Sequence, residues 1–177
     1  MATTKIQAAP QTAKRSFSAG SVISAIGRWI VRNRIYLIAF AIPAVLTYLA
    51  YALFGLYPFG EESVLCLDLN GQYVYYFEAL RDAFWGDGSI FYNWSRNLSG
   101  EFMGIIGYYL ASPFTLIVML LPEKFMLSSL LIMQLCKLGA AGATFNYFLQ
   151  KRRGVQPYPS LLFSTMYAMM AYGVIQL

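Results

Sequence analysis

Asp68 is the residue whose type and position most readily suggest catalysis. It stands directly before residues 69–85, where apolar side chains recur at helical spacing and polar side chains fill the other face. A carboxylate held there could act as a general base that removes a proton from an acceptor hydroxyl. It could equally be the N-cap of the helix, accepting hydrogen bonds from free backbone N–H groups. The two roles can coexist, although an N-cap position stabilises the charged carboxylate and so weakens a base.

Lys137 is a second candidate because it lies near the middle of an apolar run. A lysine at mid-membrane costs about 2.5–3.5 kcal/mol on insertion scales, so something must compensate. Gln134, Ala141 and Thr144 share its helical face, so its side chain is expected to point into a helix bundle. The ammonium could pair with an acid elsewhere, or bind a lipid phosphate or carboxylate. Small neighbours that would allow close helix contact are Gly139, Ala140, Gly142 and Ala143.

Other residues offer little for metal or nucleophilic chemistry. Glu61 and Glu62 could bind a metal or a substrate, but two adjacent loop acids are more often simply solvated. The chain has no His, which excludes His-containing zinc sites and Ser-His triads. Cys66 and Cys136 lack metal-ligand spacing. No residue is therefore assigned to a metal site and no cofactor is predicted, while metal dependence stays open.

The composition indicates that these residues belong to an integral membrane protein. Of the 177 residues, 58% are hydrophobic, 17% are aromatic and only 12% are charged, whereas a soluble domain has roughly 25% charged residues. The net charge of +5 lies at the edges of apolar runs. Membrane lipids are therefore the expected anionic partner, and nucleic acid is not expected.

The N-terminal elements set the expected orientation of the chain. Residues 1–20 are predicted to be a disordered cytoplasmic tail, residues 21–34 an amphipathic interfacial helix, and residues 35–55 the first transmembrane helix. Six Lys or Arg and no acid precede residue 35. By the positive-inside rule the N-terminus is cytoplasmic. The apolar stripe of the interfacial helix comprises Val22, Ile23, Ile26, Trp29 and Ile30.

The next segment, residues 56–103, is expected to be an extracytoplasmic loop. It contains seven acidic and two basic residues, a net charge of −5, which reverses the sign of the preceding segment. Residues 69–85 within it form the predicted amphipathic helix, lying on the membrane.

The number of membrane spans after the loop determines on which side of the membrane the basic cluster at 151–153 lies. If residues 104–122 and 126–150 both span, the basic cluster at 151–153 lies outside, against the charge rule. Pro113 interrupts the first stretch, so we expect a broken interfacial or re-entrant segment there. Residues 126–150 are then the second transmembrane helix and 159–177 the third. The sequence ends within that third span, and we expect it to be the N-terminal part of a longer protein.

Two strings resemble the YfhO-like family of bacterial membrane proteins. They are D-L-x-x-Q-Y at residues 68–73 and Y-Y-L-x-S-P-F at residues 108–114, and the likeness runs from about residue 57 to the C-terminus. That family is related to the GT-C glycosyltransferases, multi-pass enzymes that take a sugar from a polyprenyl-phosphate carrier on the outer membrane face. Several members are associated with decorating teichoic or lipoteichoic acid. The resemblance therefore implies an all-α, multi-pass, GT-C-like fold in the bacterial cell membrane.

The resemblance also implies roles for particular residues. An acid of the first external loop lies at the active site of GT-C enzymes, and the matching position is Asp68, with Gln72 and Tyr73 beside it as substrate-binding residues. The S-P-F segment resembles the juxtamembrane helix of those enzymes, which agrees with the expectation that residues 104–122 do not span the membrane. The family is several times longer, so a chain of this length is expected to be inactive alone.

These observations lead to one function and two alternatives. The leading hypothesis is inverting transfer of a sugar from a polyprenyl phosphate to an envelope glycopolymer, with Asp68 as base and Lys137 among the groups that offset the phosphate charge. A transporter or lipid flippase in which Lys137 lines the path is the second. The third is a membrane scaffold or an inactive truncated product.

Overall fold

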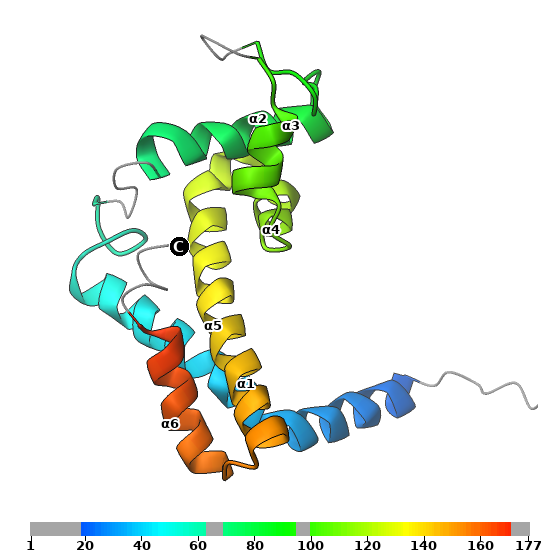
Figure 1. Cartoon of the computed structure of the whole chain (residues 1–177), viewed down its shortest axis with the longest axis vertical. Helices are drawn as coiled ribbons and strands as arrows, with labels where there is room; N and C mark the ends of the chain where they lie inside the picture. The colour runs from blue at the N-terminus through cyan, green and yellow to red at the C-terminus, as the bar shows by residue number, and fades with distance from the viewer. Residues whose placement is uncertain (1–18, 63–68, 95–99, 171–177) are drawn as a thin grey trace, which may run out of the picture. The chain divides into compact units, whose positions relative to one another are not determined.

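The computed structural model describes residues 19–62, 69–94 and 100–170 (Figure 1). Over these residues the chain is mostly helical and has no β-strand, which confirms the all-α prediction. Two helices are long and apolar enough to cross a membrane, Gly20–Leu53 and Glu123–Arg153. The predicted third span extends beyond the described residues and stays a prediction. The chain divides into two compact units, residues 1–34 and 35–177.

The described part of the first unit is the beginning of helix α1 (Ala19–Leu53). The apolar stripe predicted for the interfacial helix is helical and exposed to solvent, with Ile23 70% and Trp29 52% accessible. Arg28 and Arg32 flank Trp29 around a shallow hollow on the helix surface. An exposed apolar face beside arginines is the pattern of a helix that lies in a membrane interface. The stretches predicted as separate elements, residues 21–34 and 35–55, lie in one helix that ends at Leu53.

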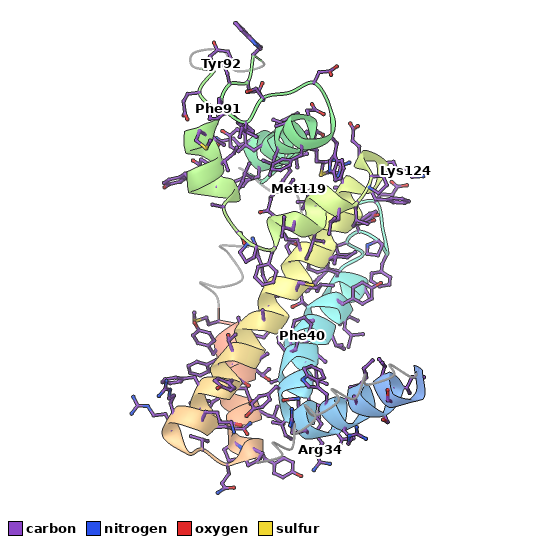
Figure 2. The ribbon with its side chains drawn as sticks, turned by 90° about the vertical axis from the view of Figure 1, so that its right-hand side faces the viewer. Arg34, Phe40, Phe91, Tyr92, Met119 and Lys124 are labelled. Atoms are coloured by element: carbon purple, nitrogen blue, oxygen red, sulfur yellow. The ribbon has the colours of Figure 1, made fainter. Side chains whose placement is uncertain are left out.

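In the second unit, α1 packs closely on α5 (Met126–Arg153) at two glycines. Pro43 has no N–H, so the Ala39 carbonyl lacks its usual helical donor. Gly142 lies against this carbonyl: a Cβ atom at Gly142 would be 2.4 Å from the Ala39 oxygen. A Cβ atom at Gly139 would be 2.8 Å from the ring of Phe40, which Figure 2 shows beside α5. Both glycines therefore allow the close contact that the small-residue pattern predicts.

A tight turn joins α5 to α6 (Pro157–Ala168). Gly154 ends α5 in the left-handed conformation, with φ 65° and ψ 20°, and its N–H donates to the Leu149 carbonyl. Glycine adopts this backbone conformation without the steric cost of a Cβ atom. Pro157 occupies the first turn of α6, where its missing N–H and fixed φ are suitable.

Buried amide and hydroxyl groups hold α5 and α6 together. Asn146, which is fully buried, donates from Nδ2 to Ser160 Oγ at 3.1 Å and to Ser164 Oγ at 3.3 Å. Gln150 Nε2 donates to Asn146 Oδ1 at 2.6 Å and to Ser160 Oγ at 3.1 Å. Hydrogen bonds of this kind link helices in an apolar environment. We expect them to fix the register of the two helices.

The remaining elements gather at one end of α5 (Figure 1). Residues 69–85 form a π-helical turn, η1 (Leu69–Tyr73), and then α2 (Val74–Trp85). Residues 104–122 lie in α3 (Met103–Ile105), η2 (Ile106–Leu110) and α4 (Thr115–Leu120), with Pro113 in the break before α4. A short turn, η3 (Glu123–Phe125), then leads into α5.

A shared apolar core, here called the loop core, joins these elements. Phe77 and Leu80 of α2 pack against Ile105, Leu110 and Val118 of the broken segment. Phe102 and two residues of α5, Leu130 and Met133, complete this core. Each fully buried side chain of this size contributes roughly 1.5–3 kcal/mol relative to leaving it exposed. The loop core therefore fixes α2 to the end of α5.

Candidate substrate-binding site

The structure describes three of the four sequence-predicted site residues, two in η1 and one in α5. Asp68 lies outside the described residues. Gln72 is an exposed residue of η1, and the half-buried Tyr73 ends that turn. Lys137 is half-buried within α5, in the part of the helix that packs on α1.

Tyr73 connects the two strings that carry the family resemblance. Its ring contacts Tyr109 of the Y-Y-L-x-S-P-F string edge to face, with ring centroids 5.2 Å apart and an angle of 89° between the ring planes. The ring centroid of Tyr109 also lies 5.5 Å from that of Tyr76 and 4.5 Å from that of Tyr108. Edge-to-face aromatic pairs contribute about 0.5–1.5 kcal/mol beyond the area that they bury. The four tyrosines, here called the tyrosine cluster, place exposed Gln72 beside the broken segment.

Arg81 fastens α2 to the C-terminus of α4. Its Nη1 atom donates to the carbonyl oxygen of Val118 at 2.8 Å and of Met119 at 3.3 Å, and also to that of Leu121. Trp85 Nε1 donates to the Met119 carbonyl at 3.0 Å. The last carbonyls of a helix lack intrahelical partners and carry partial negative charge. A guanidinium is therefore well suited to this position, and it fixes the orientation of α2.

An open cleft of about 700 Å³ lies on the side of α2 and the segment that follows it. Three carboxylates line it, those of Glu78, Asp82 and Asp87. Three aromatic side chains also line it: Tyr75, Tyr92 and Trp94. Figure 2 shows Tyr92 on the segment beyond α2. We call this feature the acidic cleft.

The carboxylate of Glu78 is affected by both burial and neighbouring charge. Partial burial raises the pKa of Glu78 above its ordinary value, and the nearby carboxylates of Glu123 and Asp82 raise it further. Glu78 and Asp82 are four residues apart on α2, so they share a helical face. Repulsion between like charges makes this surface a poor place for an anion.

Within the described ranges no three His, Cys, Asp or Glu side chains are grouped so that they could hold a metal ion. Glu61 and Glu62 are exposed, and the Glu62 carbonyl accepts a hydrogen bond from the Tyr57 N–H at 2.7 Å. Cys136 is half-buried in α5, and Cys66 lies outside the described residues. The question of a metal or substrate role for the two glutamates stays open.

The helical face predicted to carry Lys137 is only partly buried. Gln134 is buried and accepts a hydrogen bond from the Tyr51 hydroxyl at 3.2 Å. Thr144 is exposed and donates to the carbonyls of its own helix. Lys137 lies four residues beyond Met133 on α5, about 6 Å at a rise of 1.5 Å per residue, and Met133 is buried in the loop core. Lys137 is therefore about one helical turn from the loop core.

Sequence reasoning missed the acidic cleft and the role of Arg81. The spacing of Glu78 and Asp82 was a usable signal, because it places two carboxylates on one helical face. The partners of Arg81 lie 37 to 40 residues away in the sequence, and no local pattern indicates them. Sequence reasoning likewise gave no role to Glu123, although its charge raises the pKa of Glu78.

The model of the family described as "Bacterial membrane protein YfhO" matches residues 39–177, which is most of the chain. No curated protein and no solved structure matches the chain.

Proposed function

Because the chain belongs to the YfhO family of bacterial membrane proteins, we propose that it acts in transfer of a sugar from a polyprenyl-phosphate carrier to an envelope glycopolymer. Teichoic or lipoteichoic acid is the kind of acceptor proposed. The observation that supports this most directly is the contact of Tyr73 with Tyr109. It joins the two strings that carry the family resemblance into one surface beside exposed Gln72.

The proposed topology places this surface outside the cell. Residues before position 35 carry six basic and no acidic side chains, and residues 56–103 carry a net charge of −5. Such an asymmetry favours a cytoplasmic N-terminus and an extracytoplasmic loop. In this arrangement the loop core lies at the outer membrane surface, where a lipid-linked sugar would be presented.

In the proposed reaction the Asp68 carboxylate removes the proton from an acceptor hydroxyl. The hydroxyl oxygen then attacks C1 of the sugar while the bond from C1 to the phosphate oxygen breaks. The lipid phosphate leaves with the electron pair of that bond, and the configuration at C1 is inverted. Gln72 and Tyr73 are proposed to bind the substrate next to Asp68.

Lys137 is proposed to offset the charge of the lipid phosphate. Lys137 lies on α5 about one helical turn from Met133 of the loop core, so the carrier phosphate is proposed to bind beside that core. Its place on α5 distinguishes Lys137 from the loop residues. A variant with Lys137→Met should weaken use of the lipid-linked donor without weakening contact with the acceptor.

The experiment that tests the function is mass spectrometry of envelope glycopolymers from a strain that lacks this protein. The proposal predicts polymer without its sugar substituent, and restoration of that substituent by the wild-type gene. Unaltered glycosylation of every envelope polymer in the deletion strain would overturn it.

A further inference from the structure

The acidic cleft has a charge that determines what it can bind. Glu78, Asp82 and Asp87 contribute carboxylates, and among the described residues that line the cleft none is basic. The neighbouring Arg81 directs its guanidinium to the carbonyls at the end of α4. A phosphate in this cleft would be repelled by these carboxylates. The phosphate group of a carrier lipid or of a polymer is therefore expected to stay outside the cleft, and an uncharged group is the better occupant.

The aromatic side chains of the cleft offer flat apolar surfaces. Trp94 is 87% exposed and Tyr75 is 61% exposed. The rings of Tyr92 and Trp94 meet edge to face with centroids 4.6 Å apart. Tyr and Trp are common in binding surfaces because each combines an apolar ring with a polar O–H or N–H group.

Gly100 supports the position of Tyr92. A Cβ atom at Gly100 would lie 2.0 Å from the Tyr92 ring, so the ring rests directly on the glycine backbone. The Asn93 N–H donates to the Gly100 carbonyl at 2.6 Å, and the Phe102 N–H donates to the Phe91 carbonyl at 3.0 Å. These contacts fix the aromatic wall of the cleft relative to α3, which follows Phe102.

We propose that the acidic cleft binds a sugar ring, with the apolar face of the ring against Trp94 and Tyr92 and its hydroxyls donating to the carboxylates of Asp82 and Asp87. A sugar ring fits because it presents C–H groups on its face and hydroxyl donors at its edge. Carboxylate acceptors form stronger hydrogen bonds with hydroxyls than neutral acceptors do. The inference rests on the proposed function in that the sugar belongs to the donor or to the acceptor.

Ligand-observed NMR on the full chain in lipid nanodiscs tests this directly. The probes are methyl α-D-glucopyranoside and, as the anionic comparison, sn-glycerol 3-phosphate. We expect saturation transfer to the ring protons of the glucoside and little to the glycerol phosphate. Trp94→Ala should reduce the glucoside signal at least fivefold, and Trp94→Phe should restore most of it. Tyr158→Ala is the matched control, because Tyr158 is a similarly exposed aromatic residue, 81% accessible, that lies on α6.

Equal glucoside signals for wild type and Trp94→Ala would overturn the proposal, as would stronger signals for glycerol phosphate. Asp87→Asn provides a second test at an exposed position that should not affect folding. It should also weaken the glucoside signal, because one acceptor of sugar hydroxyls becomes neutral. An unchanged signal in this variant would contradict the role of the carboxylates.

Competition identifies the source of the sugar. A short-chain polyprenyl-phosphate glucose and a glucosylated glycerol-phosphate oligomer are each titrated against the glucoside. Displacement by the first assigns the cleft to the donor, displacement by the second assigns it to the acceptor, and displacement by neither contradicts the link to sugar transfer. Asp68→Asn should retain glucoside binding. Envelope glycosylation therefore tests the proposed function, and glucoside binding tests the acidic cleft, as two separate measurements.

Discussion

The guanidinium of Arg81 lies 2.8 Å from the carbonyl oxygen of Val118, and this contact joins the loop helix α2 to the end of α4. Because Arg81 also donates to the Met119 and Leu121 carbonyls, one side chain pairs several carbonyls that have no helical donor. The tyrosine cluster includes Tyr76 of α2, and Glu78 and Asp82 of α2 line the acidic cleft. Their geometry therefore depends on this contact.

Arg81→Ala should destabilise the loop core. Removing the guanidinium leaves partly buried carbonyls unpaired, which costs about 1–3 kcal/mol. Thermal unfolding in detergent and limited proteolysis of the loop would measure the effect. Arg152→Ala is the matched control, because Arg152 is an exposed residue near the end of α5. Equal unfolding temperatures for the two variants would contradict the role assigned to Arg81.

Gly142→Ala should disturb the contact between α1 and α5. Its new methyl group would meet the Ala39 carbonyl at 2.4 Å, and overpacking of this kind typically costs 1–3 kcal/mol, so we expect a loss of about that size. Gly27→Ala serves as control because nothing lies within 4 Å of a Cβ atom at Gly27. In a helix that change should be neutral or stabilising by up to about 1 kcal/mol. Unfolding measurements in nanodiscs that rank the two variants in the opposite order would refute this packing.

Asn146→Leu should weaken the pairing of α5 with α6. The change removes hydrogen bonds to Ser160, Ser164 and Gln150, and interhelical hydrogen bonds in membranes contribute about 0.6–2 kcal/mol. Thr144→Val should have little effect, since the Thr144 hydroxyl bonds only to carbonyls of its own helix. Steric trapping or thermal unfolding would compare the two. A larger loss for Thr144→Val would be inconsistent with the structure.

Glu78→Gln should stabilise the protein at neutral pH. Burial, and then the charges of Glu123 and Asp82, raise the pKa of Glu78 above its ordinary value of 4.5. A raised pKa in the fold means that the folded chain holds this proton more tightly than the unfolded chain. The contribution of Glu78 to the free energy of unfolding is therefore greatest at pH values below its pKa in the unfolded chain. It is lost as the pH rises through the pKa that Glu78 has in the folded chain.

The gain in unfolding temperature from Glu78→Gln should accordingly be larger at pH 7 than at pH 4. Glu61→Gln provides the comparison, because Glu61 is exposed. A gain that is the same at both pH values would show that the charge of Glu78 does not affect stability.

The sequence predicted those features that depend on local pattern. The period of the apolar residues predicts a helix over residues 69–85, and η1 and α2 occupy that stretch. Pro113 lies in the break between η2 and α4, as its missing donor requires. Gly139 and Gly142 do allow α1 to approach α5.

Features that depend on contacts between distant segments could not be predicted in the same way. The pairing of Arg81 with Val118, and of Asn146 with Ser164, requires knowledge of how helices are placed in space. On α5 the sequence placed Thr144 on the face of Gln134, but Thr144 is exposed while Asn146 is buried. A helix low in amphipathic character does not reveal which polar residue faces its neighbour.

The central claim is that Asp68 acts as the base in sugar transfer, and the measurement that tests it most directly is the sugar content of envelope glycopolymer in cells that express Asp68→Asn. General-base catalysis contributes about 10²- to 10⁴-fold to a rate, so we predict near-complete loss of the sugar substituent. The variant must be present in the membrane at wild-type amount, and Glu123→Gln, a change at an exposed acid with no proposed site role, should retain full glycosylation. Wild-type sugar content in the Asp68→Asn strain would contradict the account.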